Sequence, residues 1–213
     1  MEKEIISSSD GPTAVFVGGI SQEKNPVKRV KNWTQNKKYQ HNRKRAGKKV
    51  AANSHTLEET GRYIKERYLG VELDKNSQLY QEKYREYRSS LILQYRPDLV
   101  GGSLESGRPD NLEDQEAVLK WLAVLTERQE KAMEVPEEAF QIDYHLYQIE
   151  ANNVEEFYIE IEYKYDVLSM GYSGDTKSGD KICKDIYSYY GVTEDDIKNK
   201  TKRYQTLLSI LAK

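Results

Sequence analysis

The 213-residue chain contains a single cysteine, only five prolines and no long apolar run, and each shortage excludes a class of protein. Cys183 alone can form neither an internal disulfide nor a thiolate metal cluster, and we interpret it as a structural or incidental residue. One unpaired thiol is typical of a reducing compartment, so we expect a cytoplasmic protein. The apolar patch at residues 14–17 is far shorter than the roughly 20 residues that cross a bilayer. We therefore expect no transmembrane segment.

Catalytic and metal-binding motifs are also absent from the sequence. The histidines His41, His55 and His145 lie far apart and lack the one-turn spacing of a zinc-binding helix. No serine lies in a nucleophile elbow, and no glycine-rich loop with a following lysine is present to hold a phosphate. Asp175 and Asp180 lack the acidic spacing and the closing glutamate of a calcium loop. These absences predict a non-enzymatic protein with no catalytic residue, metal or cofactor.

The composition predicts a thin core rich in tyrosine. Hydrophobic residues make up 37% of the chain and charged residues 32%, which is above the usual quarter. The 17 tyrosines supply surface that can be buried while their hydroxyls reach water or a partner. Four of them, Tyr80, Tyr84, Tyr87 and Tyr95, repeat at helical spacing. We expect this stripe to face the core, although it could also stack on bases or bind a partner.

The net charge of −2 conceals a strong separation of charge along the chain. Residues 1–23 carry one base and four acids, and residues 24–49 carry eleven bases and no acid. Residues 50–213 carry 21 bases and 31 acids. A segment this basic, joined to a body this acidic, either docks on that body or binds an external polyanion.

The basic segment therefore contains the candidate binding residues. Trp33, Tyr39 and His41 lie among the cations and provide rings that can stack on bases. The candidate polyanion-binding residues are Lys28, Arg29, Lys31, Lys37, Lys38, Arg43, Lys44, Arg45, Lys48 and Lys49.

Capping signals predict an all-α fold of six to eight helices, preceded by a short β-hairpin or extended arm. Asn25 and Pro26 begin a basic helix that reaches about residue 51, and Thr56 with Glu59 forms a capping box. Further helices are expected over residues 76–96, 111–134, from 136 onward, 154–170, up to 190, and 193–211.

Residues 154–170 allow two interpretations. Ile159 and Ile161 alternate with charged residues, which is a strand pattern. Phe157, Ile161 and Leu168 also keep helical spacing over a length that is unusual for one strand. We interpret the segment as a helix.

The expected elements divide the chain at its composition changes. The glycines and serine that begin at Gly101 form the clearest linker. The halves on either side of it form one domain or two. The predicted parts are a hairpin or arm at 1–23, the basic helix at 24–52, an N-terminal helical half at 53–100, the linker at 101–110 and a C-terminal helical half at 111–213.

One short segment carries a resemblance to a known family. Ser8–Val17 reads S-S-D-G-P-T-A-V-F-V and resembles a segment near the end of the β subunit of sodium-ion-translocating carboxylate decarboxylases. In that family a similar sequence leads into a membrane helix, whereas the rest of this chain departs from the family. The resemblance implies no sodium ligand and no transport role. At most it implies a peripheral, membrane-associated accessory to such a decarboxylase.

Two main functional hypotheses follow. The first is a cytoplasmic interaction or regulatory protein whose unknown protein partner binds residues 5–49 or the tyrosine-bearing helices. The second is a nucleic-acid-binding protein that uses residues 24–49, mainly through phosphate contacts because arginine is sparse there. A weaker hypothesis attaches the same cations to an anionic membrane surface. The sequence does not indicate the oligomeric state.

Overall fold

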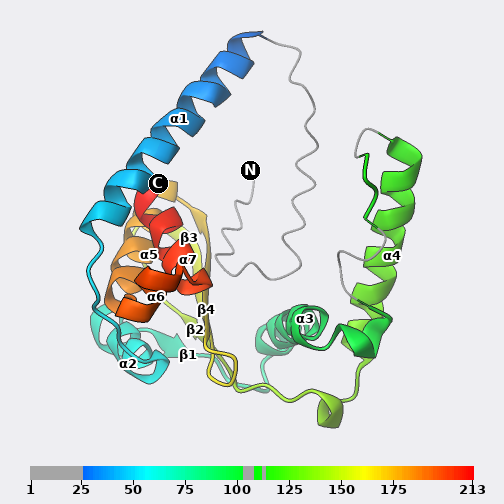
Figure 1. Ribbon diagram of the computed structural model, residues 1–213. Coiled ribbons are helices and arrows are strands. Elements are labelled where there is room, and N and C mark those ends of the chain that lie inside the picture. Colours follow the sequence, from blue (N-terminus) through cyan, green and yellow to red (C-terminus); the bar gives the residue numbers. More distant parts are fainter. Residues whose placement is uncertain (1–25, 103–107, 112–113) are drawn as a thin grey trace.

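The computed structural model describes residues 26–102, 108–111 and 114–213 (Figure 1). Its helices are α1 (Pro26–Lys49), α2 (Leu57–Tyr68), α3 (Gln78–Tyr95), α4 (Gln115–Glu134), α5 (Thr176–Tyr190), α6 (Glu194–Asn199) and α7 (Lys202–Ala212). Its strands are β1 (Val71–Glu72), β2 (Tyr144–Gln148), β3 (Val154–Glu162) and β4 (Val167–Gly174). Two short 3-10 helices are η1 (Pro97–Val100) and η2 (Glu137–Ala139). The predicted N-terminal hairpin or arm, and the Ser8–Val17 segment, lie outside the described residues.

The all-α prediction is wrong, because the four strands form an antiparallel sheet in the order β1-β2-β3-β4. Residues 154–170, interpreted as a helix, are instead β3, a turn and the start of β4. The helix expected from residue 136 is also wrong, since η2 is followed there by strand β2. The architecture is therefore a mixed α/β fold and not a helical bundle.

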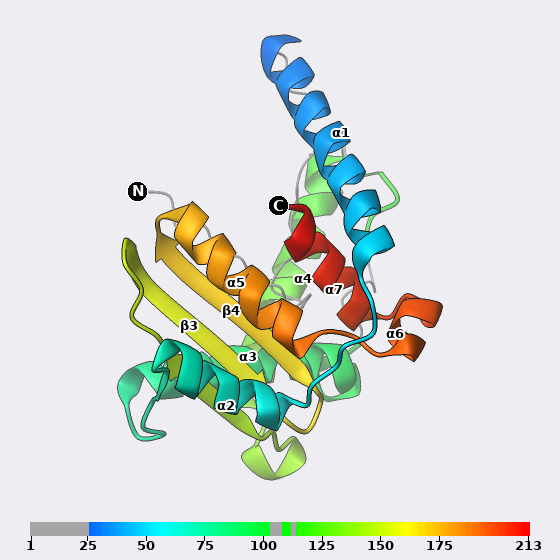
Figure 2. The same ribbon diagram turned by 90° about the vertical axis from the view of Figure 1, so that its left-hand side faces the viewer.

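Helices cover both faces of this sheet (Figures 1 and 2). On one face, Ile64 of α2 and Ile186 of α5 pack with Phe157 of β3, and α7 extends the same core. On the other face, Ile92 of α3 packs with Leu146 of β2, and α4 lies against α3. Because both faces are covered, apolar residues point to both sides of a strand, and burial of this kind stabilises each layer.

Several predicted helix boundaries are confirmed. The Glu59 N–H donates to Thr56 Oγ1 over 3.2 Å, and the Thr56 N–H donates to Glu59 Oε2 over 2.8 Å, which completes the capping box. Pro26 is the first residue of α1, and Ser77 caps α3, which ends before Pro97. These boundaries depend on neighbouring residues alone, so the local sequence is enough to place them.

No helix within the described residues combines the length and the apolar character that a membrane span requires.

Cys183 faces the core from α5 and is buried. Burial raises the pKa of its thiol to about 12. The thiolate is the reactive form, so we expect the native protein to react with Ellman's reagent at pH 8 far more slowly than the unfolded protein does. Absorbance of the released thiolate, followed with and without guanidinium chloride, measures both rates. Similar rates in the two conditions would contradict the buried position.

Candidate polyanion-binding surface

All ten candidate polyanion-binding residues lie on α1, which projects from the body as a rod (Figure 2). Its C-terminal half packs against α7, and its N-terminal turns extend beyond the other helices. Lys28, Arg29 and Lys31 belong to those projecting turns, and their side chains lie outside the description. The other seven candidates lie between Lys37 and Lys49 and have described side chains.

Small and apolar residues near the end of α1, and Val50 just after it, form the contact with α7. Ala46 and Val50 pack against the core that includes Leu208. Gly47 lets the two helices approach closely, since a Cβ there would lie 3.2 Å from Tyr204 Oη. This contact is apolar at its centre and needs no ion pair to hold the helices together.

Two polar contacts complete the α1–α7 interface. Asn42 Nδ2 donates to the carbonyl oxygen of Ala212 over 3.1 Å. The guanidinium of Arg43 donates to Gln205 Oε1, so this candidate residue has a structural partner. The sequence of α7 contains no aspartate or glutamate. Among the candidates with described side chains, Arg43 is therefore the least available to an external ligand, and no acidic group of α7 offsets the charge of α1.

The other described cations lie on the exposed side of α1, and two of them, Arg45 and Lys49, lie at its border with α7. We call this side the basic face, and it consists of Trp33, Lys37, Lys38, Lys44, Arg45, Lys48 and Lys49. Helical spacing places Trp33, Lys37, Lys44 and Lys48 along one line of this face. Trp33 is 58% exposed, and Lys37 Nζ lies 4.1 Å from the centre of its ring.

No carboxylate in the described part of the acidic body forms an ion pair with the basic face. The ion pairs among the described residues join groups within the body, such as Lys65 with Glu72 (3.0 Å) and Lys120 with Glu116 (2.8 Å). No described side chain of α1 pairs with a described carboxylate. The C-terminal half of the basic helix thus docks on the body through apolar contacts and two polar ones, and its exposed cations pair with none of the described carboxylates.

The tyrosine stripe of α3, the other candidate surface, is largely occupied by the core. Tyr80 and Tyr87 are buried, and Tyr84 is partly buried against the same cluster. Tyr95 is exposed, but its ring stacks on Tyr165 with centres 4.6 Å apart. Most of this stripe is therefore unavailable for stacking on bases.

The described histidines do not form a metal site, and no three described His, Cys, Asp or Glu side chains converge as ligands. His145 lies between Glu72 (Nδ1–Oε1, 2.5 Å) and Asp143 (Nε2–Oδ1, 3.2 Å). The His55 ring stacks on Tyr189 with centres 4.0 Å apart. Both of these rings are held by neighbouring side chains.

Sequence reasoning missed α7 as the partner of α1. The usable signal was the set of small or short polar residues on one face of the basic helix, Asn42, Ala46 and Gly47, which permits close helix packing. It was easily overlooked because α7 lies about 160 residues farther along the chain. The chain matches no protein-family model, no curated protein and no solved structure, so its function must be inferred from the geometry of its surface.

Proposed function

We propose that the protein binds nucleic acid, with little sequence preference, through the basic face of α1. The main support is that six exposed cations share one side of α1. The contact of α1 with α7 involves none of these charged groups. Residues one turn apart on a helix have Cβ atoms about 5–6 Å from each other, so several of their charged groups can contact phosphates of one strand. Lysines outnumber arginines on this face, which favours phosphate contacts over readout of base edges.

Trp33 supports single-stranded nucleic acid as the preferred ligand. Its exposed ring lies on the projecting part of α1, in line with Lys37 and Lys44. An unstacked base can lie on an exposed aromatic ring, and this interaction is worth about 1–3 kcal/mol per base whatever the sequence. A strand whose phosphates follow the lysines would therefore gain both charge contacts and stacking.

A protein partner is the second candidate, and a different surface favours it. Helix α4 packs on α3 but leaves Leu119 66% exposed and Met133 46% exposed. Their spacing places both side chains near one line of the helix. An apolar partner helix would cover such a line, which agrees with an interaction or regulatory role.

Charge neutralisation on the basic face tests the nucleic-acid proposal. Affinity for single strands falls as salt rises, and each lost phosphate contact reduces the magnitude of the slope of log affinity against log salt by about 0.7. Replacing Lys37, Lys44 and Lys48 by glutamine should thus reduce the slope by about 2 and weaken binding about 100-fold at 0.1 M salt. Fluorescence anisotropy of a labelled oligothymidylate, titrated at several salt concentrations, measures both quantities.

The matched control replaces three exposed lysines elsewhere, Lys75, Lys120 and Lys177, by glutamine. This control changes the net charge equally, so its affinity should fall by less than about threefold if the basic face is the site. Equal losses in the two triple variants, or no binding by the unmodified protein at low salt, would refute the proposal. Sedimentation with anionic vesicles separates nucleic-acid binding from attachment to a membrane surface.

A further inference from the structure

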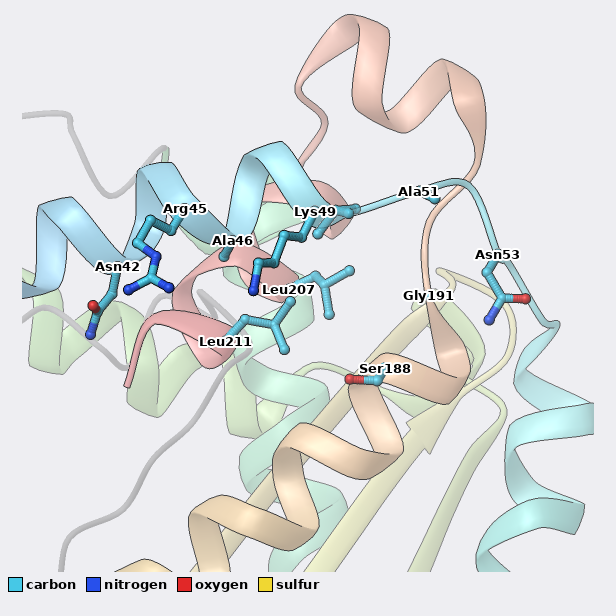
Figure 3. Close-up of a pocket in the computed structure, with 11 residues that line it drawn as sticks. Asn42, Arg45, Ala46, Lys49, Ala51, Asn53, Ser188, Gly191, Leu207 and Leu211 are labelled. Atoms are coloured by element: carbon cyan, nitrogen blue, oxygen red, sulfur yellow. The ribbon is translucent and has the colours of Figure 1, made fainter.

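A cavity of about 580 Å³ lies beside the α1–α7 contact (Figure 3). Helix α1 and the segment after it form one side, and α5 and α7 form the other. Its apolar surface comes from Ala46, Val50, Leu207 and Leu211. Small-molecule sites are typically about 300–1,000 Å³ and mostly apolar with a few polar groups, so this cavity has the size and lining of such a site.

The charged residues that line the cavity are both cationic. Arg45 and Lys49 both extend from α1 on the same side of the cavity, with Lys49 ending near Leu211 and Arg45 near Asn42 (Figure 3). No lining residue is aspartate or glutamate, and neither cation pairs with a described carboxylate. The remaining polar lining is uncharged and includes Asn53. An anion placed between the two cations would therefore not be repelled by any carboxylate of the lining.

We propose that this cavity binds a small amphipathic anion, which is an alkyl chain that ends in a carboxylate or a phosphate. The head group would contact Arg45 and Lys49, because a guanidinium donates two parallel hydrogen bonds to either kind of oxyanion. The alkyl chain would cover Leu207 and Leu211 and remove their surface from water. This inference does not depend on nucleic-acid binding, since Lys37 and Lys44 face solvent outside the cavity.

A fluorescent fatty acid provides the first test. Dansyl-labelled undecanoate, titrated into the full chain below its micelle concentration, should bind saturably with one site per chain. Laurate and dodecyl phosphate should displace it, whereas dodecyltrimethylammonium should not. If only one of the two anions displaces the probe, that result identifies the preferred head group within the proposal. Absence of saturable binding, or equal displacement by the cationic amphiphile, would overturn it.

Two variants locate the site. Ser188 is exposed on α5 and lines the cavity, so Ser188→Trp should fill it and weaken laurate binding at least tenfold without changing oligothymidylate binding. Arg45→Gln combined with Lys49→Gln should also weaken laurate at least tenfold and should abolish the preference for anions. Lys177→Gln combined with Lys181→Gln, on exposed positions of α5 outside the lining, is the control and should bind laurate normally.

Circular dichroism and thermal unfolding confirm that each variant is folded. If Ser188→Trp fails to fold, the double glutamine variant still decides the question, because it changes only exposed charges. Laurate binding at the original affinity in that double variant would refute the assigned head-group site. Loss of oligothymidylate binding in the Lys37, Lys44 and Lys48 variant, with laurate binding kept, would show that the two ligands use different parts of the molecule.

Discussion

Replacing Gly191 by alanine is expected to lower the free energy of unfolding by at least about 3 kcal/mol. Gly191 has φ 59° and ψ −157°, a backbone conformation that is essentially restricted to glycine. A Cβ at this position would lie 1.6 Å from the carbonyl oxygen of Asn53, so the backbone itself would have to move. Chemical denaturation with guanidinium chloride, followed by circular dichroism, measures the loss.

The position of Gly191 explains why the substitution should destabilise more than the turn that contains it. The segment between α1 and α2 runs beside it, and the Asn53 N–H donates to the Val192 carbonyl over 3.0 Å. Arg203 adds to this junction, because its guanidinium donates to the carbonyls of Gly191 (2.8 Å) and His55 (3.0 Å). Moving the segment to admit a methyl group would therefore disturb α2, α5 and α7 together.

Gly171→Ala is the matched control for this variant. A Cβ on Gly171 would have no atom within 4 Å, and the residue has no positive φ. The free energy of unfolding of the Gly171→Ala variant should change by less than about 1 kcal/mol. Alanine has a slight entropic advantage over glycine in a strand. If both alanine variants unfold at the same denaturant concentration as the unmodified protein, the geometry at Gly191 is wrong.

Replacing Arg88 by methionine is the second large effect, with an expected loss of about 3–5 kcal/mol. The Arg88 side chain is buried, and it donates to the carbonyl oxygens of Phe140 (2.8 Å), Val135 (2.9 Å) and Pro136 (2.7 Å). Methionine keeps the aliphatic part but supplies no donor. Three carbonyls in the segment between α4 and β2 would then lose their partner, and the loss is costliest at Phe140, where the hydrogen bond is buried.

Arg85→Met, one turn earlier on α3, is the control for Arg88. Arg85 is exposed, and the contact that its Nε makes with the Gln81 carbonyl at 3.3 Å is local. Exposed substitutions of this kind usually change stability by less than about 0.5 kcal/mol. Denaturation curves that shift equally for the two methionine variants would show that the Arg88 contacts do not hold α3 to the segment between α4 and β2.

The helix ends could be predicted from the sequence, whereas most of the sheet could not, apart from the alternation at Ile159 and Ile161 of β3. In β2, Tyr144 faces α3 and Tyr147 faces α2 and its neighbours, so both are buried and the strand shows no simple alternation. The turn between β3 and β4 contains no glycine or proline to mark it. Glu162 stabilises it instead, since its carboxylate accepts the N–H groups of Lys164 (3.2 Å) and Tyr165 (2.5 Å).

The basic helix itself was predictable, but its surroundings were not. Asn25 and Pro26 and the run of cations place α1 and its charge directly. Which side of the helix is covered depends on α7, and the cavity needs α5 as well, so these features arise only from contacts between distant parts of the chain. The sequence could name the charged residues, and only the fold separates Arg43, which is engaged, from Arg45, which is exposed.

The pairing of α1 with α7 also has a consequence for the order in which parts of the protein fold during synthesis. Asn42 and its partner Ala212 are 170 residues apart. At a synthesis rate of about 5–20 residues per second, α1 leaves the ribosome about 10–30 s before the α7 surface exists. Throughout that interval Ala46 and Val50 have no α7 to cover them, while the cations beside them are already exposed. Docking of the basic helix on α7 must therefore wait until residues 202–212 have been made.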